Sequence, residues 1–265
     1  MINPASTANT SKVIHLDGVT LCVSDVHLSE PQTRTTEFFL AFLSQHARQA
    51  NHLILLGDLF EYWAGDDDMA TPFHQCIVTA LRTVREQGCQ IYWMAGNRDF
   101  LVGSQFAATI GLSLLDDPSQ IEIHGERIVL THGDAQCTDD LAYMAFRQTV
   151  RQPERIKQFL SMPLAQRKTF IEGVRKESVQ EQKGKSMAII DVNPQAIQQL
   201  FQDSGCKILI HGHTHRPHIH QTEDGLRYVL PDWECDQHPE QPRGGWLSIG
   251  ADAQIQVHGL DQIHR

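Results

Sequence analysis

The sequence VTLCVSDVH (residues 19–27) is a short apolar run that ends in an aspartate and a histidine. We predict that Val19 to Ser24 form a buried strand, so that Asp25 and His27 lie at its carboxyl end. The same arrangement recurs four times: His52–Leu56 before Gly57-Asp58, Gln90–Ala95 before Gly96-Asn97, Arg127–Thr131 before His132-Gly133-Asp134, and Lys207–Ile210 before His211.

Segments with helical periodicity, Gln32–Ala50 and Phe73–Gln87, separate the first strands. Strands that alternate with helices predict an α/β fold, in which ligands bind beyond the carboxyl ends of the strands. The polar strand ends should therefore gather along one edge. Later strands around Ile219, Tyr228–Leu230 and Trp246–Ile249 have no helices between them and predict an antiparallel second sheet. Together these elements predict a four-layer α/β/β/α sandwich.

Length and charge limit the possible functions. The 265 residues suffice for one large domain or a domain with an insertion, and the net charge of −10 argues against a nucleic-acid partner. No obligate protein partner is indicated. The first twenty residues lack a basic start and an apolar stretch, and no run approaches the roughly 20 apolar residues of a spanning helix. We therefore expect a cytoplasmic protein whose cysteines are reduced.

The segment of about residues 139–191 differs from the rest. It has no convincing strand, its apolar residues have loose helical spacing, and ten Lys and Arg but only four Glu lie between Arg147 and Lys185. We predict a helical insertion over the active-site edge, with an ordinary solvated helix pair as the alternative. Residues 1–16 are expected to be an N-terminal extension, and residues 17–265 the domain that carries the insertion.

The strand-end clusters indicate a metal site. They combine carboxylate and amide oxygens with imidazole nitrogens, a mixture that suits Mn²⁺, Fe²⁺ or Zn²⁺ better than ions that prefer thiolates. Each cluster alone is weak evidence, but all of them together, each at a strand end, form a specific pattern. Asp66-Asp67-Asp68 are instead expected to cap a helix before Pro72 or to form a solvated turn. His211 is expected at a strand end, outside the ligand set.

The clusters resemble the metallophosphoesterase pattern D-x-H, G-D, G-N-H-[ED], H and G-H-x-H. This resemblance implies the same four-layer sandwich and two divalent ions. It assigns Asp25, His27, Asp58 and His215 to one ion, and Asp58, Asn97, His132 and His213 to the other, with Asp58 bridging. The chain departs from the pattern at Arg98, where the pattern has a histidine that assists the leaving group.

Longer motifs are similar to those of the UDP-2,3-diacylglucosamine hydrolase family: GDLFEYW at 57–63, GNRDF at 96–100, CTDD at 137–140 and HGHTHRP at 211–217. The resemblance runs from about Asp17 to beyond Pro217. It implies cleavage of a pyrophosphate to UMP and 2,3-diacylglucosamine 1-phosphate (lipid X) in lipid A synthesis, with Mn²⁺. It also implies substrate contacts by Asn97, Arg98, Asp140, Ser178, Gln182, Lys185 and His213, where Gln182 replaces the usual Asn.

The expected mechanism follows from these roles. A hydroxide shared by the two ions attacks one phosphorus in line, while the ions and Arg98 offset the charge on the phosphoryl oxygens. The residues expected to act in catalysis are Asp58, Asn97, Arg98, His132 and His213. Arg98 has the alternative of a structural salt bridge to Asp99 or Glu61.

An apolar and basic helical lid would suit this substrate, since it offers surface to the acyl chains and cations to UDP. Such a lid also predicts peripheral binding to the cytoplasmic face of the anionic inner membrane. Two other functions remain open. One is a different metallophosphoesterase, such as a nucleotide phosphodiesterase or a soluble nucleotide-sugar pyrophosphatase. The other is a non-catalytic scaffold, although such a protein would be expected to lose ligands.

Overall fold

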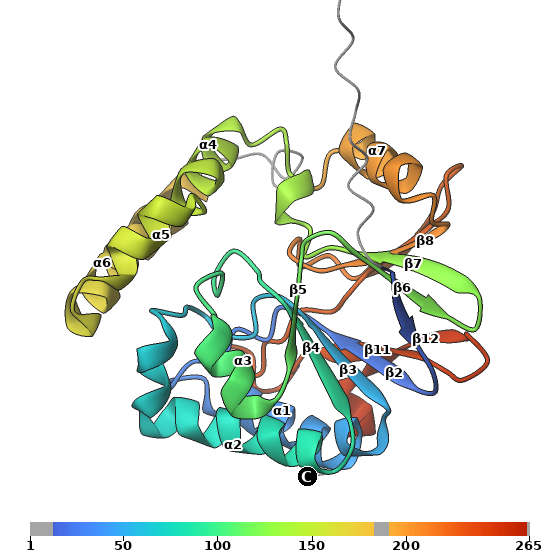
Figure 1. The fold of residues 1–265 in the computed structure, drawn as a ribbon, viewed down its shortest axis with the longest axis horizontal. Helices are drawn as coiled ribbons and strands as arrows, with labels where there is room; N and C mark the ends of the chain where they lie inside the picture. Colours follow the sequence, from blue (N-terminus) through green and yellow to red (C-terminus); the bar gives the residue numbers. More distant parts are fainter. Residues whose placement is uncertain (1–12, 183–190, 264–265) are drawn as a thin grey trace, which may run out of the picture.

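Two six-stranded sheets lie between layers of helices in the computed structural model, which describes residues 13–182 and 191–263, and of residues 177–182 only the backbone (Figure 1). The first sheet has the order β12 (Ile255–Gly259), β11 (Gly245–Ile249), β2 (Thr20–Val23), β3 (His52–Leu56), β4 (Gln90–Met94), β5 (Ser113–Leu115). The second has the order β1 (Ile14–Leu16), β6 (Ser119–Ile123), β7 (Glu126–Leu130), β8 (Ile208–His211), β10 (Leu226–Val229), β9 (His218–Gln221).

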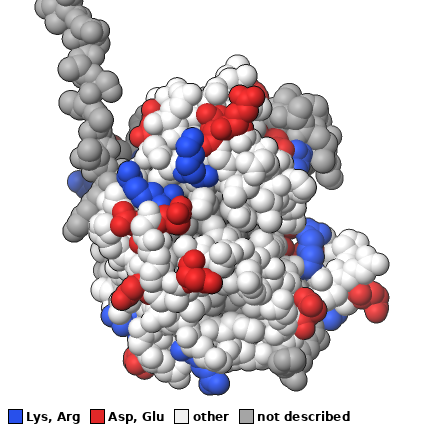
Figure 2. Space-filling model, turned by 90° about the vertical axis from the view of Figure 1, so that its right-hand side faces the viewer, with Lys and Arg blue, Asp and Glu red and all other residues white. Residues whose placement is uncertain are grey.

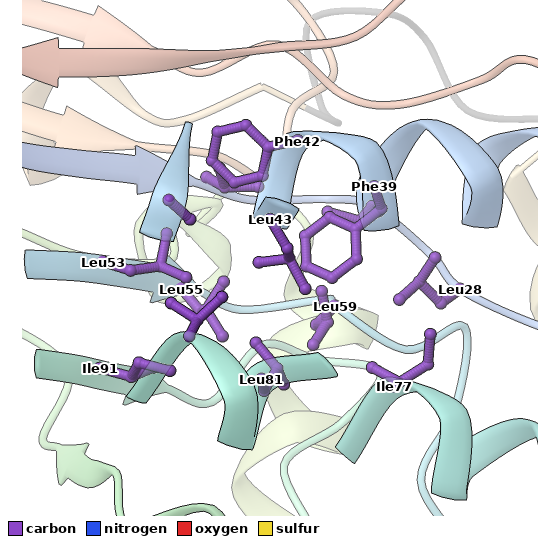
Figure 3. Close-up of a cluster of buried hydrophobic side chains, with 14 of the residues drawn as sticks. Leu28, Phe39, Phe42, Leu43, Leu53, Leu55, Leu59, Ile77, Leu81 and Ile91 are labelled. Atoms are coloured by element: carbon purple, nitrogen blue, oxygen red, sulfur yellow. The ribbon is translucent and has the colours of Figure 1, made fainter. Parts of the chain in front are cut away.

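Helices cover the outer face of each sheet. Helices α1 (Thr33–Gln45), α2 (Pro72–Glu86) and α3 (Ser104–Ile110) cover the first sheet, and α7 (Pro194–Ser204) covers the second. Figure 3 shows Phe39 and Leu43 of α1 and Leu81 of α2 pointing into one apolar cluster, with Leu53 and Leu55 of β3 beside them. The predicted four-layer α/β/β/α architecture is therefore confirmed.

Residues 53–56 of strand β3 are all apolar because both faces of the strand are buried. Leu53 and Leu55 point into the cluster under α1 and α2, whereas Ile54 and Leu56 point into the core between the two sheets. Both faces of the strand are buried, so the four positions after His52 are apolar instead of alternating with polar ones.

The antiparallel second sheet predicted after Pro217 is wrong in its pairing. Strand β11 joins the first sheet, antiparallel to β2, and β10 pairs with β8 in parallel. Only β9 and β10 form the expected antiparallel pair. The absence of helices between these strands did not reveal their pairing, because the chain crosses from one sheet to the other between β10 and β11.

The start of the domain also differs from the expected boundary at residue 17. Strand β1 pairs in parallel with β6, and Leu16 is buried between the sheets. Residues 14–16 therefore belong to the fold instead of the extension. Residues 1–12 lie outside the described residues.

Three consecutive helices occupy the described part of the predicted insertion: α4 (Leu141–Val150), α5 (Pro153–Leu160) and α6 (Leu164–Gln182). They project from the two-sheet body in Figure 1. Ile156 and Phe159 of α5 pack against the outer core cluster, so the base of this helical arm has an apolar contact with the body. We call residues 141–182 the helical arm.

The surface and the helices add two observations. Figure 2 shows the face at the right of Figure 1, where basic and acidic side chains lie in small mixed groups. Within residues 13–182 and 191–263, no helix is both long enough and apolar enough to cross a membrane.

Candidate metal centre

Both sheets contribute to one site through the loops at their strand ends. Asp25 and His27 follow β2, Asp58 follows β3 and Asn97 follows β4, all in the first sheet. His132, His213 and His215 follow β7 and β8 of the second sheet. The structure brings these seven predicted residues together as two neighbouring groups of side chains. His211 ends β8 and belongs to neither group, as expected.

The first group consists of Asp25, His27 and His215. The Nε2 atoms of the two histidines lie 3.2 Å apart, and Oδ1 of Asp25 lies 3.9 Å from Nε2 of His27 and 3.4 Å from Nε2 of His215. Asp25 Oδ1 is buried and has no hydrogen-bond partner among the described residues. His215 is the most exposed member of the group, so a ligand can enter from its side.

The second group consists of Asp58, His132 and His213, with Asn97 beside them. His132 Nε2 lies 3.7 Å from Asp58 Oδ1 and 3.1 Å from Asn97 Oδ1, and His213 Nδ1 lies 2.9 Å from Asn97 Oδ1. The other ring nitrogen of His132 lies 2.8 Å from the carbonyl oxygen of Leu56. That carbonyl needs a donor, so Nδ1 carries a proton and Nε2 faces the group.

The backbone of this site is strained. Residues other than glycine rarely adopt a positive φ angle, and those that do are concentrated at functional sites. Five of the seven adopt it: Asp25 (53°), His27 (55°), Asp58 (55°), His213 (67°) and His215 (53°). The surrounding hydrogen bonds must hold these residues in place, as in a site built for binding.

Two glycines allow the close approach of the loops. A Cβ at Gly96 would lie 2.0 Å from Asp58 Oδ1, and a Cβ at Gly212 would lie 2.2 Å from Asp25 Oδ2. Both distances are far below van der Waals contact, so any side chain at these positions would displace a carboxylate of the site.

Negative charge is in excess at the site. Burial lowers the pKa of His132, but the nearby carboxylates, Asp58 first, outweigh it and raise this pKa to about 9. Burial and the positive charge of His132 lower the pKa of His213 to about 4. Burial raises the pKa of Asp25, but the adjacent His215 and the charges of the other histidines bring it well below its ordinary value. Divalent cations would balance the carboxylates, and the unpartnered oxygen of Asp25 fits a metal ligand.

Asp99 holds the loop that carries Asp58. Its buried carboxylate accepts hydrogen bonds from the backbone amides of Leu59 (2.9 Å) and Gly96 (2.9 Å), and from that of Asp58 (3.3 Å). Burial and the neighbouring Asp58 raise the pKa of Asp99 to about 7. Among the described contacts, Asp99 forms no ion pair with Arg98.

Arg98 is available to a ligand. Among the described residues no ion pair includes it, although Glu61 and Asp99 were its predicted alternatives. Its backbone N–H donates to Asp58 Oδ1 at 2.8 Å, which fixes the residue beside the second group.

The remaining predicted substrate contacts lie just before the helical arm, on it or after it. Asp140 caps α4 by accepting a hydrogen bond from the backbone of Tyr143 at 3.1 Å. Ser178 and Gln182 lie in the last turns of α6, where side chains are not described, and Lys185 lies outside the described residues.

A buried carboxylate with no predicted role fastens α4 to the site edge. Asp134 accepts hydrogen bonds from the Tyr143 hydroxyl (2.7 Å), from Arg147 Nε (2.8 Å) and from Arg151 (3.2 Å). Arg151 also donates to the carbonyl oxygen of Gly96 at 2.8 Å. The H-G-D motif includes Asp134, but the sequence did not show which side chains it contacts. Its partners on α4 and just after it come close to Asp134 only in the folded structure.

The acidic triplet 66–68 serves contacts that the sequence did not indicate. Asp66 accepts hydrogen bonds from backbone amides at the start of α3, Asp67 pairs with Arg167 of α6, and Asp68 lies 2.6 Å from Lys168. The expectation of a cap before Pro72 or a solvated turn is therefore wrong, since Thr71 caps α2.

Comparisons with known proteins agree with this geometry. Residues 19–217 match the family model of the calcineurin-like phosphoesterases. A UDP-2,3-diacylglucosamine hydrolase of Ralstonia nicotianae is 41% identical over 258 residues, which cover 94% of this chain and 96% of that protein. The protein of the same name from Aromatoleum aromaticum is 44% identical over 234 residues, or 87% and 94% of the two chains.

Proposed function

This chain belongs to the calcineurin-like phosphoesterases and, within them, to the UDP-2,3-diacylglucosamine hydrolase family, and from that membership we propose that it cleaves the pyrophosphate bond of UDP-2,3-diacylglucosamine. The products would be UMP and 2,3-diacylglucosamine 1-phosphate (lipid X), a step of lipid A synthesis. The observation that supports this proposal most directly is the convergence of seven metal-ligating side chains in a chain of this family. The enzyme is a metal-dependent hydrolase.

The proposed ligand assignment follows the two groups. Asp25, His27, Asp58 and His215 would hold one divalent ion, and Asp58, Asn97, His132 and His213 would hold the other. Mn²⁺ is the proposed ion. When bound, such ions polarise phosphoryl oxygens and lower the pKa of water. The protein contributes the buried carboxylates and the fixed imidazole orientations.

Arg98 and the polar edge of the site bind the substrate. The guanidinium group is always charged, and its planar fork fits phosphoryl oxygens. Arg98 has no competing ion pair among the described residues, which supports this role. Asn97, Asp140, Ser178, Gln182, Lys185 and His213 are the further proposed substrate contacts.

The helical arm is the proposed site of the acyl chains and of membrane contact. It carries four of the large apolar side chains that are exposed in the structure: Leu141, Phe146, Leu160 and Phe170. Its described basic residues Arg155, Lys157 and Lys176 are in no ion pair, so they can meet anionic lipid head groups. We place the enzyme in the cytoplasm, on the inner face of the inner membrane.

Hydrolysis of UDP-2,3-diacylglucosamine with Mn²⁺ tests the activity. The comparison includes wild type, Asp58→Ala and Arg98→Ala, with UDP-N-acetylglucosamine as the unacylated control substrate. We expect UMP from the acylated substrate alone and none with Asp58→Ala. Equal turnover of the control would refute the lipid specificity, and turnover of only simple phosphodiesters would favour a different phosphoesterase.

Membrane binding needs a separate test. Sedimentation with phosphatidylglycerol-containing vesicles should remove the wild-type protein from solution, whereas neutral vesicles should remove less. A Phe146→Ser, Phe170→Ser double variant should bind the anionic vesicles less well. Equal partitioning with and without anionic vesicles would contradict the proposed location.

A further inference from the structure

Two of the metal-ligating imidazoles have a carboxylate behind the ring nitrogen that faces away from the site. His27 Nδ1 lies 2.9 Å from Glu61 Oε2, and His215 Nδ1 lies 3.4 Å from Asp232 Oδ2. The opposite nitrogens of these rings are the ones that meet 3.2 Å apart in the first group. A carboxylate in this position fixes the tautomer and the direction of a metal-ligating histidine.

The two carboxylates are anchored to different parts of the molecule. Asp232 is buried in the two-sheet body and accepts hydrogen bonds from Arg243 Nε (3.0 Å) and a terminal nitrogen of the same guanidinium (2.8 Å). Glu61 instead forms an ion pair with Arg175, which lies on α6 of the helical arm. His215 is thus supported through Asp232 by the two-sheet body, whereas His27 is supported through Glu61 by the helical arm.

We propose that Glu61 is a positioning residue through which helix α6 orients His27, so that docking of the helical arm and binding of divalent ions at the first group strengthen each other. This coupling rests on the proposed metal centre. Coupling between two binding events is reciprocal, so whatever fixes Arg175 against Glu61 must raise the affinity for the ion, and the ion must hold the arm.

The arm offers a matched comparison for Arg175. Lys168 of α6 also forms an ion pair with the body, at 2.6 Å from Asp68. Asp68 contacts none of the seven metal-ligating residues; its carboxylate also lies 3.8 Å from His74 Nδ1. Loss of Lys168 therefore loosens the arm by a similar ionic contact but leaves Glu61 and His27 in place.

Calorimetric titration of the full chain with Mn²⁺ tests the positioning step. Glu61→Ala should weaken one of the two Mn²⁺ sites by about 10–100-fold, and Glu61→Gln by less, because its amide oxygen can still accept a hydrogen bond from His27 Nδ1. Arg175→Ala should weaken the same site by about 5-fold or more, whereas Lys168→Ala, which keeps the Arg175–Glu61 ion pair, should weaken it much less. Circular dichroism of each apo variant checks the fold.

The outcomes distinguish the positioning role of Glu61 and its coupling to the helical arm from the proposed metal centre itself. Unchanged Mn²⁺ affinity in Glu61→Ala would overturn the positioning role, and equal affinities in Arg175→Ala and Lys168→Ala would overturn the coupling to the arm. Failure of the wild-type protein to bind Mn²⁺ would instead overturn the proposed metal centre itself.

Limited trypsin digestion tests the reverse direction. Saturating Mn²⁺ should slow cleavage after Lys176 of α6 in the wild type, and much less so in Glu61→Ala. Asp232→Ala removes the carboxylate that the body anchors, so it should keep the protection once Mn²⁺ saturates. Equal protection in wild type and Glu61→Ala would contradict the proposal.

Discussion

At the scale of single residues, the site depends on backbone conformations and distances that tolerate little change. Asp25, His27 and Asp58 have positive φ angles, and the glycines beside them leave room for carboxylates that a Cβ would displace. Each positive φ angle is a local feature of one residue, but the groups that hold these residues in place come from both sheets.

Gly96→Ala should therefore damage the site. The new Cβ would lie 2.0 Å from Asp58 Oδ1, so Asp58 or the loop must move. We expect hydrolysis to fall by about 100-fold, the loss that a misplacement near 1 Å can cause. Gly173→Ala is the control: no atom lies within 4 Å of its Cβ, and the exposed helix should gain about 0.5–1 kcal/mol in unfolding free energy. Similar activity of both variants would contradict the close approach.

Arg98→Ala should lower kcat by about 10²–10³-fold, as loss of one group that stabilises transition-state charge does. Its guanidinium is in no ion pair with the described ligands, so Mn²⁺ affinity should not change. Arg98→Lys should recover only part of kcat because an ammonium group lacks the planar fork. A variant that lost Mn²⁺ affinity in proportion to kcat would show that Arg98 supports the metal centre instead.

At the scale of elements, helix ends are held by carboxylates from distant parts of the chain. Helix α1 has no cap from its own Gln32. Instead Asp236 accepts hydrogen bonds from the backbone amides of Arg34 (2.9 Å) and Thr35 (3.0 Å) and from the Thr35 hydroxyl (2.7 Å). The chain segment between β10 and β11 thereby fixes the start of α1.

Replacing Asp236 by Ala should lower the unfolding free energy by about 1 kcal/mol, the usual effect of losing a helix cap. Burial raises the pKa of Asp236, but hydrogen bonds from Thr35 and Arg34 outweigh it and lower this pKa. A carboxyl with a lowered pKa stabilises the fold above its unfolded pKa, which is about 3.9. The stability difference between wild type and Asp236→Asn should therefore shrink as pH falls below about 4. Urea unfolding at several pH values measures it, and a constant difference would contradict this cap.

Helix α4 depends on a buried charge. Asp134→Asn would leave Arg147 and Arg151 without their counter-charge, at a cost of about 3–5 kcal/mol. Tyr143→Phe removes one hydrogen-bond donor from the same carboxylate and should cost about 1 kcal/mol. Urea unfolding compares the two variants. Equal losses would mean that the arginines do not need Asp134.

At the scale of the whole molecule, the proposed metal centre lies between the two sheets. Its proposed ligands follow β2, β3 and β4 on one side and β7 and β8 on the other, so an ion bound between them would link both halves of the sandwich. An ion that binds only the folded state stabilises it by mass action.

EDTA should therefore lower the midpoint of thermal unfolding, and Mn²⁺ should restore it. Each site that is filled at 100 times its dissociation constant contributes about 2.7 kcal/mol. Differential scanning calorimetry measures the effect, and Asp25→Ala should respond to Mn²⁺ less than wild type. A midpoint that EDTA leaves unchanged in the wild type would argue against ions that bridge the sheets.

The sequence by itself determined the layers, most strands of the first half and the seven residues that converge at the site. These follow from local signals: an apolar run predicts a strand, and the polar residues that end it must lie at the sheet edge. The tertiary structure decided the pairing of β10 and β11, the inclusion of Ile14–Leu16 in a sheet, and the partners of Asp134, Glu61 and Asp232. Such contacts join residues far apart in the chain. The same kind of hydrogen bond can form between residues at many different separations in the sequence. A carboxylate's type and position in the chain therefore do not reveal which distant imidazole or guanidinium it meets.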